Sequence, residues 1–214
     1  MKKILIQVVL VAISAFIAFQ IYKTVEQPIL FEKAKKERYQ KVVAQLKDIR
    51  KAELAFKSVN GQFTGSWDTL VTFVAEDSLP LVRRIGSLTD SMVDAGWTEA
   101  KALKKGLIIR DTLYVGVQDS LFKTASFDAS KLPVIPYTNN ERFQLGAGVV
   151  TTGSGVQVQV FEAKCHNNQY LRSLKEEYGQ FIINDNEAAR VNNKFPGLKV
   201  GSLTEANNNA GNWE

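Results

Sequence analysis

The chain opens with a long apolar run. Ile4 to Ile21 contains no charged residue, and its only polar members are Gln7, Ser14 and Gln20. As a helix, these eighteen residues would cover about 27 Å, close to the hydrocarbon thickness of a bilayer. The pattern predicts a membrane anchor, assigned to residues 1–25. Two lysines before an apolar run also resemble a secretory signal. We expect an uncleaved anchor, with cleavage as the alternative.

The next segment changes from uniformly apolar to one-sided. Pro28 predicts a kink or short break, and helix-forming residues fill the stretch from Ile29 to Val59. We assign residues 26–60 to an amphipathic helix that ends at Asn60-Gly61. Steps of three and four separate the apolar residues of its stripe, and Glu53 stands where a further apolar residue would fall. The stripe consists of Tyr39, Val42, Leu46, Ile49 and Phe56.

Additional apolar residues widen this stripe beyond the narrow seam of a two-stranded coiled coil. They are Val43, Ala52, Ala55 and Val59. The width favours packing against a sheet or several helices, and a coiled coil is the alternative. After the helix, Phe63 and Leu70 are predicted to fold back over Phe56, while Ser66 caps a short second helix.

The order of anchor, striped helix and aromatic turn resembles type IV pilins and pseudopilins over about residues 1–75. The turn runs from Ala52 to Leu70 and includes Asn60-Gly61, Phe63 and Ser66. The family pattern also has a leader glycine and a glutamate at the fifth position of the mature chain. Here the first glycine is Gly61 and the first acidic residue is Glu26. The resemblance thus implies a pilin-like roll and self-assembly, without the usual processing.

The remainder predicts an α+β fold, in which the long helix packs on an antiparallel sheet. Residues 61–105 are predicted to form a loop and short helices. From Gly106, β-branched and aromatic residues reach strand density in segments 107–117, 143–150 and 155–162. We therefore assign residues 106–206 to an antiparallel β domain. Residues 207–214 are predicted to be a polar tail, either disordered or a docking tip.

Few residues suggest chemistry. The chain has one cysteine and one histidine, the neighbours Cys165 and His166, and adjacent strand residues point to opposite faces. Two carboxylate pairs, Asp119 with Asp128 and Glu162 with Asp185, have no spacing that fixes a shared site. No phosphate-binding loop or nucleotide motif is present. The sequence predicts neither an enzyme nor a metal, cofactor or small-molecule substrate site.

The charge distribution bears on partners and orientation. There are 27 basic and 22 acidic residues, and basic residues concentrate in segments 33–41 and 101–105. This favours contact with membrane lipid over nucleic acid. The positive-inside rule would put the domain in the cytoplasm. We nevertheless predict a single-pass protein of a bacterial inner membrane with a periplasmic or extracellular domain, because the pilin resemblance implies export.

Two functions follow from these features. The first is a structural subunit that assembles with itself or with other envelope-complex subunits, using as packing residues the stripe together with Phe63 and Leu70. The second is a single-pass scaffold of an envelope machine, in which the striped helix recruits a partner helix.

Overall fold

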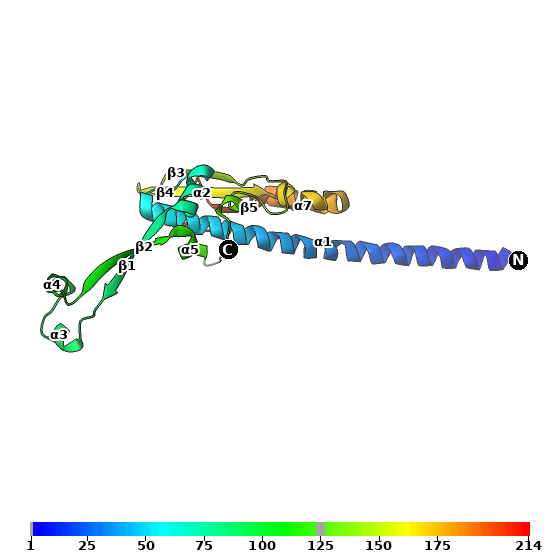
Figure 1. The fold of residues 1–214 in the computed structure, drawn as a ribbon. Helices are drawn as coiled ribbons and strands as arrows, with labels where there is room; N and C mark the ends of the chain where they lie inside the picture. The colour runs from blue at the N-terminus through cyan, green and yellow to red at the C-terminus, as the bar shows by residue number, and fades with distance from the viewer. Residues whose placement is uncertain (1, 123–126) are drawn as a thin grey trace.

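A single long helix organises the molecule. The computed structural model describes residues 2–122 and 127–214. Helix α1, Lys2–Asn60, is followed by a body packed on its second half, while its first part extends away from the body (Figure 1). The fold is α+β, with two small antiparallel sheets. The apolar run and the striped helix predicted from the sequence are therefore two parts of one continuous element.

Pro28 does not interrupt α1, so the predicted break is wrong. Proline removes one backbone donor and crowds the preceding turn. Thr24, Val25 and Gln27 are all exposed on that turn. The carbonyl left without its helical partner can be solvated there, and the long helical segments on both sides hold the turn in register.

A three-stranded antiparallel sheet lies over the second half of α1. Its order is β3 (Gln144–Thr151), β4 (Gln157–His166), β5 (Gly197–Gly201). The central strand β4 buries alternate residues, Phe161, Ala163 and Cys165, in the core that it shares with α1. The strands predicted around segments 143–150 and 155–162 are confirmed.

A helix that the sequence did not predict lies inside segment 106–206. Helix α7, Lys175–Val191, follows the short helices α6 (Asn167–Tyr170) and η2 (Arg172–Leu174). It runs beside α1, where Phe31 meets the rings of Tyr178 and Phe181 at centroid distances of 5.6 and 5.4 Å. The assignment of residues 106–206 to an antiparallel β domain omitted this helix, because a largely polar sequence forms a helix held by a few aromatic and aliphatic contacts.

The junction after α1 follows the sequence prediction in outline. Gly61 has φ of +74°, and its N–H donates to Lys57 at 2.8 Å. Ser66 caps α2 (Trp67–Glu76) by accepting a hydrogen bond from the Thr69 N–H at 3.4 Å. Phe63 and Leu70 lie in the same core cluster as Phe56, but the ring packed against Phe56 is a different one. The Phe56 ring contacts Phe73 at 5.1 Å, whereas Phe63 packs on Phe161 of β4 at 4.9 Å.

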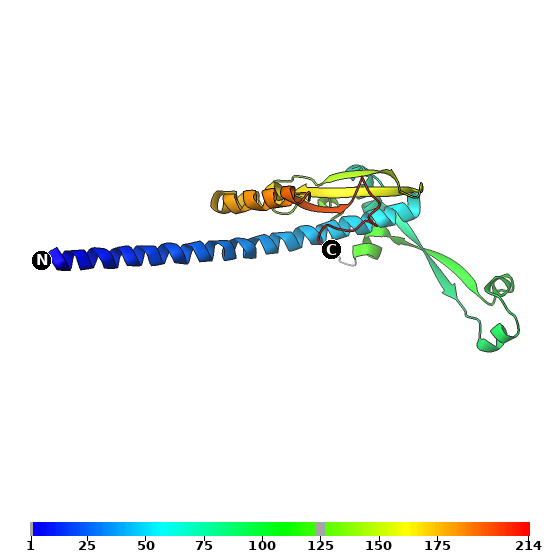
Figure 2. The same ribbon diagram turned by 180° about the vertical axis from the view of Figure 1, so that it is seen from behind.

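A two-stranded ribbon projects from the body. Strand β1 (Ser78–Ile85) pairs with β2 (Ile109–Gly116), and short helices α3 (Asp90–Asp94) and α4 (Glu99–Lys104) form its tip. We call residues 78–116 the arm. It points away from the N-terminus in both views (Figures 1 and 2). Strand β1 corrects the prediction of loop and short helices alone for residues 61–105.

The remaining segments close the core. Helix α5 (Val117–Phe122) and the turn η1 (Ala129–Lys131) contribute Val117 and Ala129 to it. The C-terminal residues are ordered against β5, since Gly211 bridges Val200 and the Asn212 N–H donates to Lys199 at 3.0 Å. The disordered alternative for the tail is therefore wrong, and the docking tip stays a prediction. Backbone bonds and an ion pair between Glu214 and Arg50 hold the tail in place.

Candidate functional site

The first part of α1 makes no packed contact with the rest of the chain. Every residue from Ile6 to Ile21 is exposed. By length and composition α1 is apolar enough to cross a membrane, and no second such helix occurs in residues 2–122 and 127–214. A signal sequence near an N-terminus meets the same criteria. The exposed apolar cylinder is nevertheless a surface that water solvates poorly.

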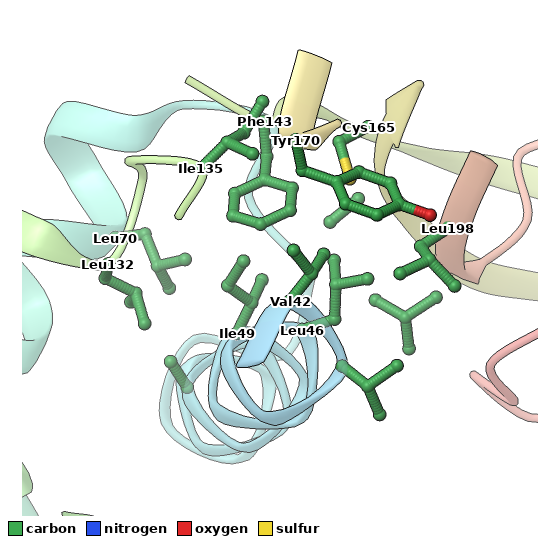
Figure 3. Close-up of a cluster of buried hydrophobic side chains, with 14 of the residues drawn as sticks. Val42, Leu46, Ile49, Leu70, Leu132, Ile135, Phe143, Cys165, Tyr170 and Leu198 are labelled. Carbon is green, nitrogen blue, oxygen red and sulfur yellow. The ribbon is translucent and has the colours of Figure 1, made fainter. Parts of the chain in front are cut away.

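The predicted packing residues lie together at the centre of the body. Val42, Leu46 and Ile49 are completely buried, and Phe143, Tyr170 and Leu198 lie across from them (Figure 3). The other predicted members are Phe56, Phe63 and Leu70, all buried in the same core, and Tyr39, which packs against its edge. These side chains hold the body on α1. The stripe is therefore covered by the chain's own residues.

Polar side chains at the edges of the stripe fix the register of α1 against the loops. The Gln45 side-chain amide lies within hydrogen-bond distance of three carbonyls, those of Lys131, Leu132 and Val134, at 2.8, 3.0 and 2.6 Å. Arg38 donates to the Tyr170 carbonyl at 3.1 Å and to Ser173 Oγ at 2.7 Å. Sequence periodicity gave no signal for these contacts, because their acceptors are backbone groups far along the chain.

Glu53 is a carboxyl group enclosed in the core. It is 0% exposed, and its Oε2 accepts the Thr64 N–H at 3.1 Å. Its Oε1 is buried and has no hydrogen-bond partner in the part of the chain that the structure describes. Burial raises the pKa of Glu53 to about 8, although the Thr64 bond opposes the shift. The carboxyl group therefore ties the end of α1 to the following loop in its neutral form at pH 7.

Cys165 and His166 form no catalytic pair. Cys165 points into the core toward Tyr170 (Figure 3), whereas His166 caps α6 by accepting the Asn168 N–H at Nδ1. Burial raises the pKa of the Cys165 thiol to about 12. Because the thiolate is the reactive form, this cysteine is an unreactive core residue.

The thiol of Cys165 should therefore resist alkylation in the folded protein. We expect the full chain at pH 8 to react with a maleimide at least tenfold more slowly than after unfolding in urea. The control is Ser87→Cys at an exposed arm position, which should label rapidly without denaturant. Equal labelling of Cys165 before and after unfolding would contradict its burial.

Three of the four carboxylates considered from the sequence lie in ion pairs of their own. Glu162 lies 2.6 Å from Lys164 and 3.7 Å from Lys199, while Asp185 meets Lys35 at 2.6 Å. Asp128 caps η1 and lies 3.6 Å from Lys131. Within residues 2–122 and 127–214, no group of three or more histidine, cysteine, aspartate or glutamate side chains could hold a metal ion. These acidic groups therefore serve local pairing.

A cleft of about 460 Å³ lies between α6 and α7. His166, Ile182 and three cationic side chains line it, but two of those cations are already paired. Arg172 binds Glu141 and Arg190 binds Glu187, at 2.6 and 2.8 Å. The cleft thus presents Lys175 and a capping histidine, without a nucleophile and base in contact.

No protein-family model, curated protein or solved structure matches this chain.

Proposed function

We propose that this chain is a membrane-anchored structural subunit of pilin or pseudopilin type, which assembles through helix packing into an envelope filament or secretion-type complex. One observation supports it above all. In the single helix α1, the segment from Ile6 to Ile21 has no buried residue, whereas Val42, Leu46 and Ile49 are fully buried under a sheet. A helix divided in this way suits a subunit whose body stands on a membrane-embedded stem.

The alternative scaffold would recruit a partner helix through the stripe. That surface is occupied, because the stripe belongs to the core of the chain itself. Burial of the stripe therefore favours the structural subunit over this form of scaffold. In the proposed arrangement the exposed segment before Phe31 contacts lipid and neighbouring stems, and the body faces the periplasm or the exterior.

Protease accessibility of the full chain tests the anchorage and the orientation. We expect the chain in the membrane fraction, with its body digested in intact spheroplasts and a protected N-terminal fragment left in the membrane. The basic segment 33–41 favours the opposite orientation, with the body in the cytoplasm. Protection of the body until lysis would place it in the cytoplasm and contradict the pilin-type proposal. A soluble chain that starts beyond Ile21 would instead identify a cleaved signal sequence.

A further inference from the structure

The arm carries an apolar face that the rest of the chain leaves open. Cross-strand partners lie on the same face of a ribbon, so the register groups Leu81 with Leu113 and Ile85 with Ile109. These four side chains are 43 to 54% exposed. Leu79 and Val115 continue the face toward the body, where they are half-buried. We call these six residues the apolar arm face.

The opposite face of the ribbon is built differently. Pro80 lies opposite Tyr114, Val82 opposite Thr112, and Arg84 opposite Arg110. Tyr114 and Val82 are exposed as well, at 74 and 62%, but the outer end of this face carries two like charges. Glu99 of α4 forms an ion pair with both arginines, at 3.8 Å from Arg84 and 2.9 Å from Arg110. The two arginines lower the pKa of Glu99, chiefly through its hydrogen bond with Arg110. The tip thus supplies a partner for the two arginines of the opposite face, whereas the four outer residues of the apolar arm face stay about half exposed in the described chain. Packed on a second copy, the opposite face would also place Arg84 against Arg110 of that copy, two like charges.

An uncovered apolar ribbon is a physical problem. An isolated two-stranded sheet is marginally stable in water, and it gains stability by packing one face on another surface. Only the base of this arm contacts α2 and α5. A partner that buries the four outer apolar residues would therefore stabilise the arm.

The charges on the apolar arm face indicate what that partner is. Arg83 and Asp111 form an ion pair at 3.3 Å between the Leu81–Leu113 and Ile85–Ile109 pairs. Consider two copies packed face to face about a two-fold axis that runs along the strands. Arg83 of each copy then lies over Asp111 of the other, and each apolar pair lies over its own equivalent. The face is complementary to itself in both charge and apolarity.

The other simple two-fold axis runs across the strands and gives a worse arrangement. It would place Arg83 over Arg83 and Asp111 over Asp111, and like charges in contact are unfavourable. It would also put the two bodies at opposite ends of the paired arms. The axis along the strands keeps both bodies, and hence both α1 stems, at the same end.

We propose that the apolar arm face binds the same face of a second copy of this chain. The inference rests on the proposed function, because it supplies a lateral contact between anchored subunits. Two strands of eight residues present about 270 Å² per copy at usual strand dimensions. This area is well below the roughly 1,200 Å² total of a stable complex. The contact therefore forms where a shared membrane concentrates the copies.

Cysteine cross-linking in membranes tests the contact. Leu81→Cys in the full chain should give a covalent dimer with a short bis-maleimide. The matched control is Val82→Cys, the next residue along β1, which lies on the opposite face and is more exposed at 62%. We expect at least tenfold less dimer from the control. The native Cys165 does not compete, because it is buried.

Charge reversal in the Leu81→Cys background tests whether residues 83 and 111 of the two copies meet in the contact. Arg83→Asp gives a chain with two carboxylates on the face, and Asp111→Arg gives a chain with two guanidinium groups. Either chain alone should lose the dimer, whereas coexpression of the two, with different tags, should restore mixed dimers. Failure of the mixed pair, while the unmodified charges support the dimer, would overturn the charge contact between the two faces.

The outcomes separate this inference from the proposed function. Absence of the Leu81→Cys dimer, while an amine-reactive reagent still links copies of the chain, overturns the arm contact and leaves assembly in place. Monomers with both reagents overturn both proposals. Equal dimer from Leu81→Cys and Val82→Cys, or an adduct between Leu81→Cys and a different protein, overturns the second copy as the occupant of this face.

Discussion

Replacing Leu46 with aspartate is expected to unfold the body of the protein. Leu46 is 0% exposed and lies at the centre of the core between α1 and the sheet (Figure 3). Truncation of such a leucine to alanine costs about 2–5 kcal/mol. Burying an unpaired carboxylate adds a desolvation cost to the cost of the lost packing. Together the two costs are comparable to the whole free energy of unfolding of many domains. Denaturant unfolding of the detergent-solubilised full chain measures the effect.

Leu54→Asp is the matched control for this substitution. Leu54 lies on the same helix but is 45% exposed. The two substitutions change charge and helix propensity equally, so only burial differs. We expect the control to alter the free energy of unfolding by about 0.5 kcal/mol or less. A cooperative, wild-type-like transition for Leu46→Asp would contradict the assignment of this stripe to the chain's own core and revive the scaffold alternative.

Glu53 is expected to make stability depend on pH. The unfolded chain releases this proton near the ordinary glutamate pKa of 4.5, whereas the folded protein retains it until about pH 8. Between these values the folded state binds more protons, so rising pH favours unfolding. The loss of folding stability caused by Glu53 is absent below about pH 4.5. It grows by about 1.4 kcal/mol for each pH unit and reaches its full size above about pH 8.

Glu53→Gln should remove this dependence. The glutamine oxygen can still accept the Thr64 N–H, but the side chain no longer titrates. Urea midpoints should be measured from pH 5 to 9. The midpoint of the variant should rise relative to that of the wild-type protein up to pH 8, and the difference should then stay constant. Glu37→Gln, at an exposed position of the same helix, serves as the control. A constant difference across this pH range would show that Glu53 has an ordinary pKa when folded.

Local patterns in the sequence predicted what local physics controls. The uncharged run to Ile21 and the stripe through Leu46 both follow from residue spacing along one helix. Gly61 and Ser66 mark the ends of helices through turn and capping chemistry that involves near neighbours. These features were identified because each depends on residues within a few positions of one another.

Strand β1 was not predicted because its local pattern is weak and its pairing partner lies far along the chain. Pro80 and the Arg83-Arg84 pair weaken the strand pattern, and the partner of Ile85 is Ile109, beyond two short helices. Proline is tolerated here because a two-stranded ribbon has only edge strands. Helix α7 was missed for a related reason, since its polar sequence is held beside α1 by contacts such as Phe31 with Tyr178.

By itself, the sequence determined that a long apolar stem leads into a one-sided helix and that an α+β body follows. The tertiary structure decided that Glu53 is enclosed and that the arm leaves Leu81 and Ile85 uncovered. It also decided that Cys165 packs in the core while His166 caps a helix. The reason is physical. Periodicity records which side of an element is apolar, whereas burial of a single group and exposure of a whole face depend on which distant elements meet there.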